Sequence, residues 1–157
     1  MPNATRKTSD SPARDPIADA RARADALYRS AMECCRQHDR IAKLVADEAD
    51  IERKHLEAMC HMCDGSLTEL ADEYRKATGD GEPGEEPWWH KANALWHASR
   101  EYARRHAGCD ALVKSVSGKH SPEKLRDMQL EYELEASALL ALRHAAAAYQ
   151  KTRPGLS

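Results

Sequence analysis

The segment PEKLRDMQLEYELEASALLALRHAAAAYQK at residues 122–151 decides the fold class. Its apolar residues recur at steps of three and four, which places them on one stripe of an α-helix. Ser121 and Pro122 form an N-cap with proline at the first helical position, and Pro154-Gly155 stops the helix. The stripe has a single charged member, Glu135, and consists of Leu125, Met128, Tyr132, Glu135, Leu139, Leu142, Ala146 and Tyr149.

The first half of the chain is also helical in pattern. Order is predicted to begin at Asp15-Pro16, and no glycine or further proline follows before Cys63. A single helix of that length would run ~70 Å at 1.5 Å per residue, which is too long for a compact bundle of this size. The sequence therefore predicts a turn near Gln37–Asp39, with Asp47–Asp50 as the alternative.

The next predicted boundary is Asp64-Gly65, where a glycine in the C′ position ends a helix. The residues Ser66-Leu67-Thr68-Glu69 have the pattern of a capping box that begins another helix, which ends at Thr78-Gly79. An acidic loop is predicted over residues 79–87.

Pro87 is predicted to open the third helix, which runs to about Ala107. Gly108 ends or bends this helix in the prediction, and a further stretch reaches Ser117. The alternating pattern of a β-strand is absent from the sequence. The expected architecture is all-α, an antiparallel four-helix-bundle-like single domain over residues 15–153. A disordered N-terminal tail is expected over residues 1–14, which are mostly polar.

Composition narrows the functional classes. The chain has 157 residues and a formal net charge of -2, which argues against nucleic-acid or anionic-membrane binding. No apolar run approaches the ~20 residues that span a bilayer, and the polar N-terminus does not have the pattern of a secretory signal. The five cysteines are an odd number, which disfavours a secreted disulfide framework. We therefore expect a cytoplasmic protein with reduced thiols.

Ionisable residues fall on helix faces that are otherwise apolar. Glu48, Glu52 and His55 are spaced i, i+4, i+7 within the apolar face of residues 39–63. The Glu-x-x-His spacing of Glu52 and His55 matches that of carboxylate-bridged metal bundles. A charge in a helical core costs several kcal/mol unless it is paired, neutralised or bound to metal. These residues are therefore candidate ligands of a divalent transition metal.

Facing helices supply further candidate donors. Two of these donors are His106 and Glu135. The predicted ligand set is therefore Glu48, Glu52, His55, His106 and Glu135, and Glu131 and His38 are additional donors. Carboxylate and imidazole ligands suit iron, manganese or zinc. A second Glu-x-x-His motif, which a di-metal bundle normally carries, is absent from the sequence. The alternative is that Glu48, Glu52 and His55 pair with one another or with an arginine.

Two functional hypotheses follow. The first is a non-catalytic interaction or regulatory protein that acts through amphipathic helices, as a homo-oligomer such as a homodimer or with a partner protein. It rests on the absence of a catalytic motif and on long apolar helix faces. The second is a metal-binding bundle with a site built on Glu52, His55 and Glu135.

Overall fold

The chain folds into four helices. The computed structural model describes residues 15–46, 50–79, 87–115 and 121–156, with the side chains of residues 44–46, 50–56, 58, 59 and 113 outside the description. The helices are α1 (Pro16–Ala46), α2 (Asp50–Thr78), α3 (Pro87–Ser115) and α4 (Pro122–Lys151). The all-α prediction is confirmed, and the described ranges contain no strand. The predicted tail at residues 1–14 lies outside the described residues.

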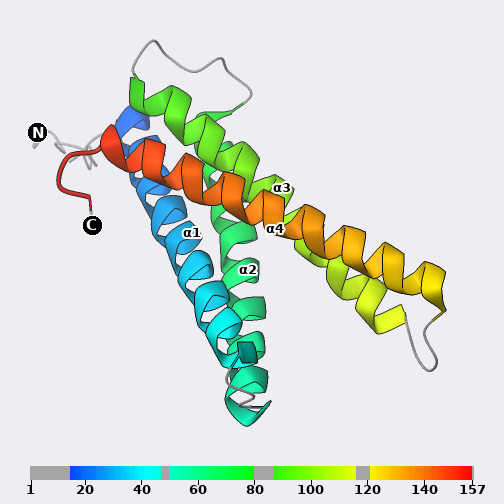
Figure 1. Ribbon diagram of the computed structural model, residues 1–157. Coiled ribbons are helices and arrows are strands. Elements are labelled where there is room, and N and C mark those ends of the chain that lie inside the picture. The colour runs from blue at the N-terminus through cyan, green and yellow to red at the C-terminus, as the bar shows by residue number, and fades with distance from the viewer. Residues whose placement is uncertain (1–14, 47–49, 80–86, 116–120, 157) are drawn as a thin grey trace, which may run out of the picture.

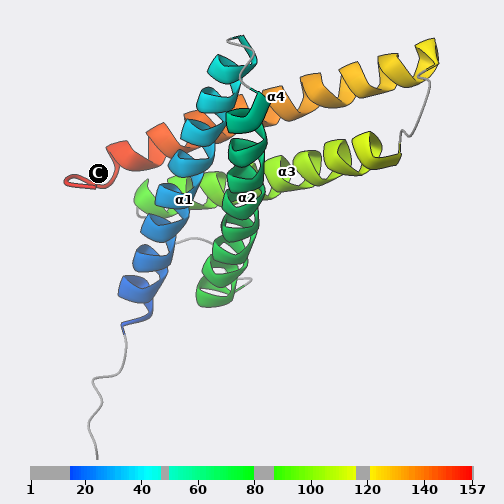
Figure 2. The same ribbon diagram turned by 90° about the horizontal axis from the view of Figure 1, so that it is seen from below.

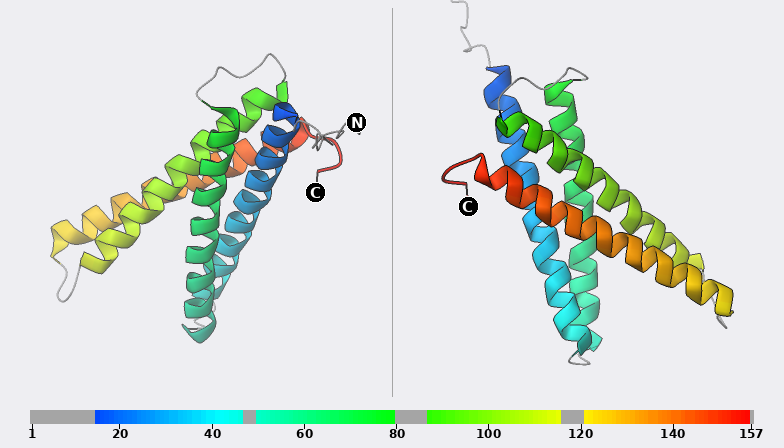
Figure 3. Two further views of the ribbon diagram at one scale, coloured as in Figure 1. Left: turned by 180° about the vertical axis from the view of Figure 1, so that it is seen from behind. Right: turned by 45° about the horizontal axis from the view of Figure 1, so that its top comes forward.

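The helices pair into two hairpins, α1–α2 and α3–α4, whose members run antiparallel (Figure 1). The hairpins pack together near the start of α1 and the end of α4, and they diverge toward their tips (Figures 1 and 3). The view from below shows the tip of α3–α4 well clear of α1–α2 (Figure 2). The four-helix arrangement is therefore open at one end rather than a bundle with parallel sides.

The first predicted turn, at Gln37–Asp39, is wrong. The two helices are separated at the alternative position, where residues 47–49 lie outside the described residues. Helix α1 continues through Gln37–Asp39 to Ala46, and α2 begins at Asp50. A turn at Gln37–Asp39 would be needed only if each helix stayed within a compact body. The long hairpins are tolerated because their tips leave the body, where no other helix limits their length.

The predicted boundary at Asp64-Gly65 is also wrong. Helix α2 passes through both residues and ends at Thr78, where Gly79 adopts the left-handed φ of 67°. The Thr68 hydroxyl donates to the carbonyl oxygen of Asp64 at 3.0 Å instead of taking part in a cap. Likewise, α3 passes through Gly108 to Ser115. One glycine costs a helix only about 1 kcal/mol relative to alanine, which tertiary packing can offset.

The core lies where the hairpins overlap. It is rich in alanine, which lets the helices approach closely, and in tyrosine and leucine, which fill the remaining volume. In α1 the buried residues run from Ala20 to Gln37, and in α4 they begin only at Ala138. Of the predicted stripe on α4, Leu142, Ala146 and Tyr149 are buried, whereas Leu125 and Tyr132 are each 50% exposed. The same stripe therefore leaves the core and continues along the projecting half of α4.

Polar contacts tie the hairpins together at the closed end. Asp25 accepts a hydrogen bond from the Tyr149 hydroxyl at 2.6 Å. It also accepts two hydrogen bonds from the guanidinium group of Arg153, at 3.0 and 2.7 Å. Burial alone would raise the pKa of Asp25, but the hydrogen bonds from Arg153 and Tyr149 hold that pKa below its usual value. The Trp96 indole N–H donates to the carbonyl oxygen of Ala71 at 2.9 Å. None of the described helices combines the length and apolar character needed to cross a membrane.

The continuity of α2 predicts opposite effects for two glycine substitutions. A Cβ at Gly65 would meet nothing within 4 Å, so Gly65→Ala should raise the free energy of unfolding by about 0.5–1 kcal/mol. Gly79 has a φ of 67°, so Gly79→Ala should lower it by about 1–2 kcal/mol. Urea denaturation followed by circular dichroism measures both. A helix end at Gly65 would instead make Gly65→Ala destabilising.

The Asp25 contacts predict a pH-dependent loss of stability. Asp25→Asn should lower the free energy of unfolding by about 2 kcal/mol at neutral pH, because Arg153 loses its charged partner. A depressed pKa stabilises the fold above the ordinary value of 3.8, and this stabilisation is lost as the pH falls through the lower folded value. The difference between wild type and variant should therefore shrink in acid. Asp72→Asn, which breaks the exposed pair with Arg100, is the control and should cost about 0.5 kcal/mol.

Candidate metal centre

Each of the four helices contributes one ionisable residue to a cluster at the edge of the core. His38 follows the last buried residue of α1, and Glu135 precedes the first buried residue of α4. Asp64 lies in the middle of α2, and His106 lies on the inner face of α3. The cluster therefore sits where the two hairpins begin to separate, between the apolar core and the open end.

The imidazole of His106 lies between two carboxylates. Its Nδ1 is 3.1 Å from Oε1 of Glu135, and its Nε2 is 3.0 Å from Oδ2 of Asp64. The side chains of His106 and Glu135 are 18% and 16% exposed, and that of Asp64 is 8% exposed. The hydrogen bond with Glu135, aided by the charge of Asp64, raises the pKa of His106. Without metal, Nδ1 of His106 is placed to share a proton with the Glu135 carboxylate, while Asp64 faces the other ring nitrogen.

Glu135 stays ionised in this setting. Burial would raise the pKa of Glu135, but hydrogen bonds with His106 and Cys109 bring that pKa below its usual value. Burial and the contact with Glu135 raise the pKa of the Cys109 thiol to about 12. The carboxylate therefore presents a negative charge toward the imidazoles, while the neighbouring thiol stays protonated.

His38 completes a group of three donors. One nitrogen of His38, one nitrogen of His106 and one carboxylate oxygen of Glu135 lie within 4.8 Å of one another. Burial lowers the pKa of His38, so its ring is neutral and can offer a lone pair. The buried Tyr102 hydroxyl contacts Nε2 of His38, and the two rings meet edge to face with centroids 5.6 Å apart. Tyr102 therefore fixes the orientation of the His38 ring.

The carboxylate of Asp64 has an unusual environment. Neither of its oxygens takes part in a hydrogen bond of regular geometry with the described residues, although the Cys34 thiol and the Tyr102 hydroxyl interact with it and His106 lies 3.0 Å away. A buried acid normally has its hydrogen-bonding capacity met, because an unmet group costs about 1–3 kcal/mol or more. This arrangement is typical of a carboxylate that orients a metal-bound histidine through its other ring nitrogen.

A cavity of about 310 Å³ opens beside the three donors. His61 stands at this cavity with its side chain 53% exposed, and its Nδ1 lies 3.2 Å from Nε2 of His106. Asp110 is 3.9 Å from His61 on the other side. The lining residues are His38, Ile41, Glu57, Cys60, His61, His106, Cys109, Asp110, Tyr132 and Glu135.

The structure brings together two of the five residues predicted as ligands, His106 and Glu135. Glu48 lies outside the described residues, and Glu52 and His55 lie in α2 with their side chains outside the description. Their role as ligands stays a prediction. His38, which the sequence offered as an additional donor, belongs to the group of three.

Asp64 is the residue that the sequence argument missed. The glycine that follows Asp64 predicts a helix end, and at a helix end the spacing does not indicate whether a side chain points into the core. Within the continuous α2, Asp64 lies four residues after Cys60 and three before Leu67, both of which are buried. That spacing is the signal that could have placed it on the inner face.

No protein-family model, no curated protein and no solved structure matches this chain.

Proposed function

We propose that this protein binds a divalent transition-metal ion through His38, His106 and Glu135. The observation that carries the proposal is the convergence of these three partly buried donors within 4.8 Å. They come from three different helices, so their meeting is a property of the fold and not of one helical turn. Two imidazoles and a carboxylate form a ligand set that suits iron, manganese or zinc.

The spacing of the donors supports this proposal. Metal–nitrogen and metal–carboxylate bonds are about 2.0–2.2 Å long, so two ligands at right angles lie about 3 Å apart. Nδ1 of His106 and Oε1 of Glu135 are 3.1 Å apart. The ion would replace the proton that these two groups share, as metal binding to histidine generally requires.

Asp64 fits the same proposal as the partner of the second nitrogen. With Nδ1 of His106 turned toward Glu135, Nε2 is left to face Asp64 at 3.0 Å. A carboxylate in this place fixes the ring orientation and raises the basicity of the ligand. A proton on Nε2 of His106 would then donate a hydrogen bond to the buried Asp64 carboxylate.

The test is metal retention by the full chain purified without a histidine tag. After separate loading with Fe²⁺, Mn²⁺ or Zn²⁺ and desalting, elemental analysis should find close to one ion per chain for at least one metal. His38→Ala and Glu135→Gln should reduce affinity by well over tenfold, and Asp64→Asn by about 10–100-fold. Saturation at a hundredfold excess over Kd should stabilise the fold by about 2.7 kcal/mol.

Matched controls are an exposed histidine on α3 and an exposed glutamate on α4. His90→Ala and Glu123→Gln should bind metal as wild type does, because both side chains face solvent. Glu52→Ala shows whether the predicted Glu52–His55 pair takes part in binding. Retention that is negligible for all three metals, or unchanged in His38→Ala and Glu135→Gln, contradicts the proposal.

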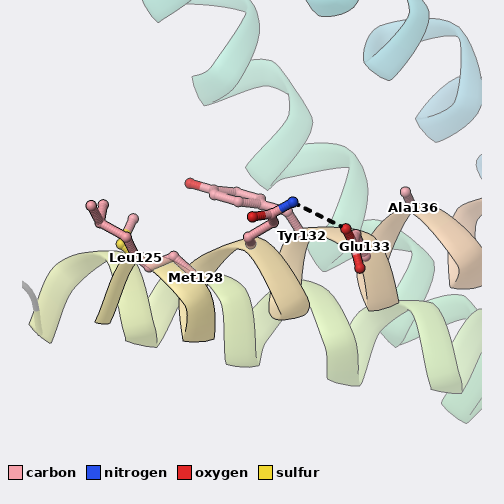
Figure 4. Close-up of a pocket in the computed structure, with 6 residues that line it drawn as sticks. Leu125, Met128, Tyr132, Glu133 and Ala136 are labelled. Atoms are coloured by element: carbon pink, nitrogen blue, oxygen red, sulfur yellow. Dashed lines mark hydrogen bonds between the residues drawn. The ribbon is translucent and has the colours of Figure 1, made fainter. Parts of the chain in front are cut away.

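The projecting half of α4 favours a second function, self-association. Leu125 and Tyr132 are each 50% exposed, although the same stripe is buried further along the helix at Leu142, Ala146 and Tyr149. Figure 4 shows Leu125, Met128 and Tyr132 along one side of this half, beside a groove of about 460 Å³. The buried part of the stripe packs against other helices of its own chain. A second copy of the protein has helices of the same geometry, and we propose that a second copy covers the exposed part of the stripe.

Sedimentation velocity over a range of concentrations tests self-association. The wild-type chain should approach the mass of a dimer, and Leu125→Glu should remain monomeric because a charge enters the apolar seam. Ile17→Glu is the matched control, since Ile17 is an apolar residue of α1 that is 45% exposed and far from the groove in sequence. A strict monomer at all concentrations overturns this second function.

A further inference from the structure

We propose that the bound ion is ferrous iron with open coordination positions, and that these positions take up a small uncharged diatomic ligand from the cavity beside His106. This inference rests on the proposed metal site. It adds the identity of the ion and the chemical class of a second ligand.

The three donors are of a kind that binds ferrous iron. His38, His106 and Glu135 are two imidazoles and one carboxylate. This set with open positions is typical of non-haem ferrous sites and also of catalytic zinc sites, whereas sets of soft thiolates select copper(I) or zinc. A ferrous ion binds a neutral diatomic ligand and zinc does not, so the nitric oxide experiment below distinguishes the two metals. Cys60 and Cys109 lie at the same cavity but do not belong to the group of three.

The number of donors is a further argument. Three protein ligands leave one to three positions free on an ion that accepts four to six ligands. Asp64 does not fill one of them, because it faces Nε2 of His106 while Glu135 faces Nδ1. Among the described residues no fourth donor belongs to the group, so within this part of the chain the remaining positions are open to ligands from outside the protein.

The cavity gives such ligands access. All three donors belong to the lining of the same space of about 310 Å³. One water molecule takes up about 30 Å³ of liquid, so this space is ample for a diatomic molecule and lies at the lower limit for a drug-sized one. Ile41, Cys60, Cys109 and Tyr132 give part of the wall an apolar or weakly polar character.

The negative charge of the carboxylates around the ion favours an uncharged ligand over an anion. The carboxylates of Glu135 and Asp64 together balance the two positive charges of a ferrous ion. Glu57 adds further negative charge to the lining, the charge of Asp110 is balanced by Lys114 at 2.8 Å, and His61 is the nearest additional base. An anion that enters would lose hydration without meeting a net positive site. A neutral diatomic molecule has no such cost.

The experiment uses the full chain loaded with Fe²⁺ under anaerobic conditions and nitric oxide as the probe. Nitric oxide bound to a ferrous ion with histidine and carboxylate ligands gives a half-integer-spin EPR signal that ferrous iron alone does not show. We expect this signal at close to one spin per bound iron. It should disappear in Glu135→Gln and remain in the control Glu123→Gln.

Cavity variants test the route to the ion. Ile41→Phe and Cys60→Leu enlarge wall side chains that are not among the proposed ligands. Each should retain iron but show at least tenfold weaker nitric oxide binding, with thermal unfolding used to verify that the variant is folded. If one variant fails to fold, the other carries the test.

The outcomes separate this inference from the proposed function. Stoichiometric iron without the nitric oxide signal overturns the inference and leaves the metal site standing. Absence of iron binding overturns this inference, and negligible retention of iron, manganese and zinc alike overturns the proposed function too. A signal typical of dinitrosyl iron on thiolates would assign the iron to cysteines and overturn this inference. A signal unchanged in Ile41→Phe and Cys60→Leu overturns the role of the cavity.

Discussion

The fold depends on how one partly buried imidazole is compensated. His106 lies at the edge of an apolar core with a carboxylate on each side, Asp64 from one hairpin and Glu135 from its own. Taking these charges out of water costs several kcal/mol for each, and their mutual contacts recover that cost only with good geometry. The relative placement of α2, α3 and α4 is constrained by this requirement. A core built from alanine alone would allow the hairpins to slide against each other with little penalty.

The position of the cluster follows from the packing on either side of it. At the closed end, alanine-lined helices approach closely and tyrosines fill the remaining space. The helices separate toward the tips (Figure 1), and residues 38–43 of α1 are at most partly buried. At this transition the inward-facing side chains are polar, because partial access to water lowers the free-energy cost of burying their charge. The site therefore lies at the boundary that the helix packing itself creates.

Much of the fold was predictable from the sequence, because a periodic apolar stripe fixes a helix and one of its faces. The bounds of α4 were predicted to within a residue or two, since Ser121 and Pro122 mark its start. The path of α1 and α2 was not predicted well. Single glycines and polar pairs signal a turn only when tertiary contacts do not outweigh them. Gly65 lies inside a helix that is packed on both sides of it, by Asp64 and Leu67.

The site was predictable only in part for a related reason. The inward faces of His106 and Glu135 follow from helical spacing within one helix each. Which residues of α1 and α2 meet them depends on the register and crossing of the hairpins, and a sequence pattern does not contain this information. Asp64 was out of reach once its helix was assumed to end there. The apolar stripe of α4 also predicted a core along its whole length, although only Leu142, Ala146 and Tyr149 of that stripe are buried and Leu125 and Tyr132 are exposed.

The divergence of the hairpins has a mechanical consequence. Glu135 lies thirteen residues after Pro122 in α4, so the helix between them is a rigid arm of about 20 Å at 1.5 Å per residue. Asp25 anchors the opposite end of the same helix through Tyr149 and Arg153. A load applied at the tip would thus pivot α4 about that anchor, and the displacement would reach Glu135 before it reached the core. The helix is a lever, and the carboxylate lies partway along it.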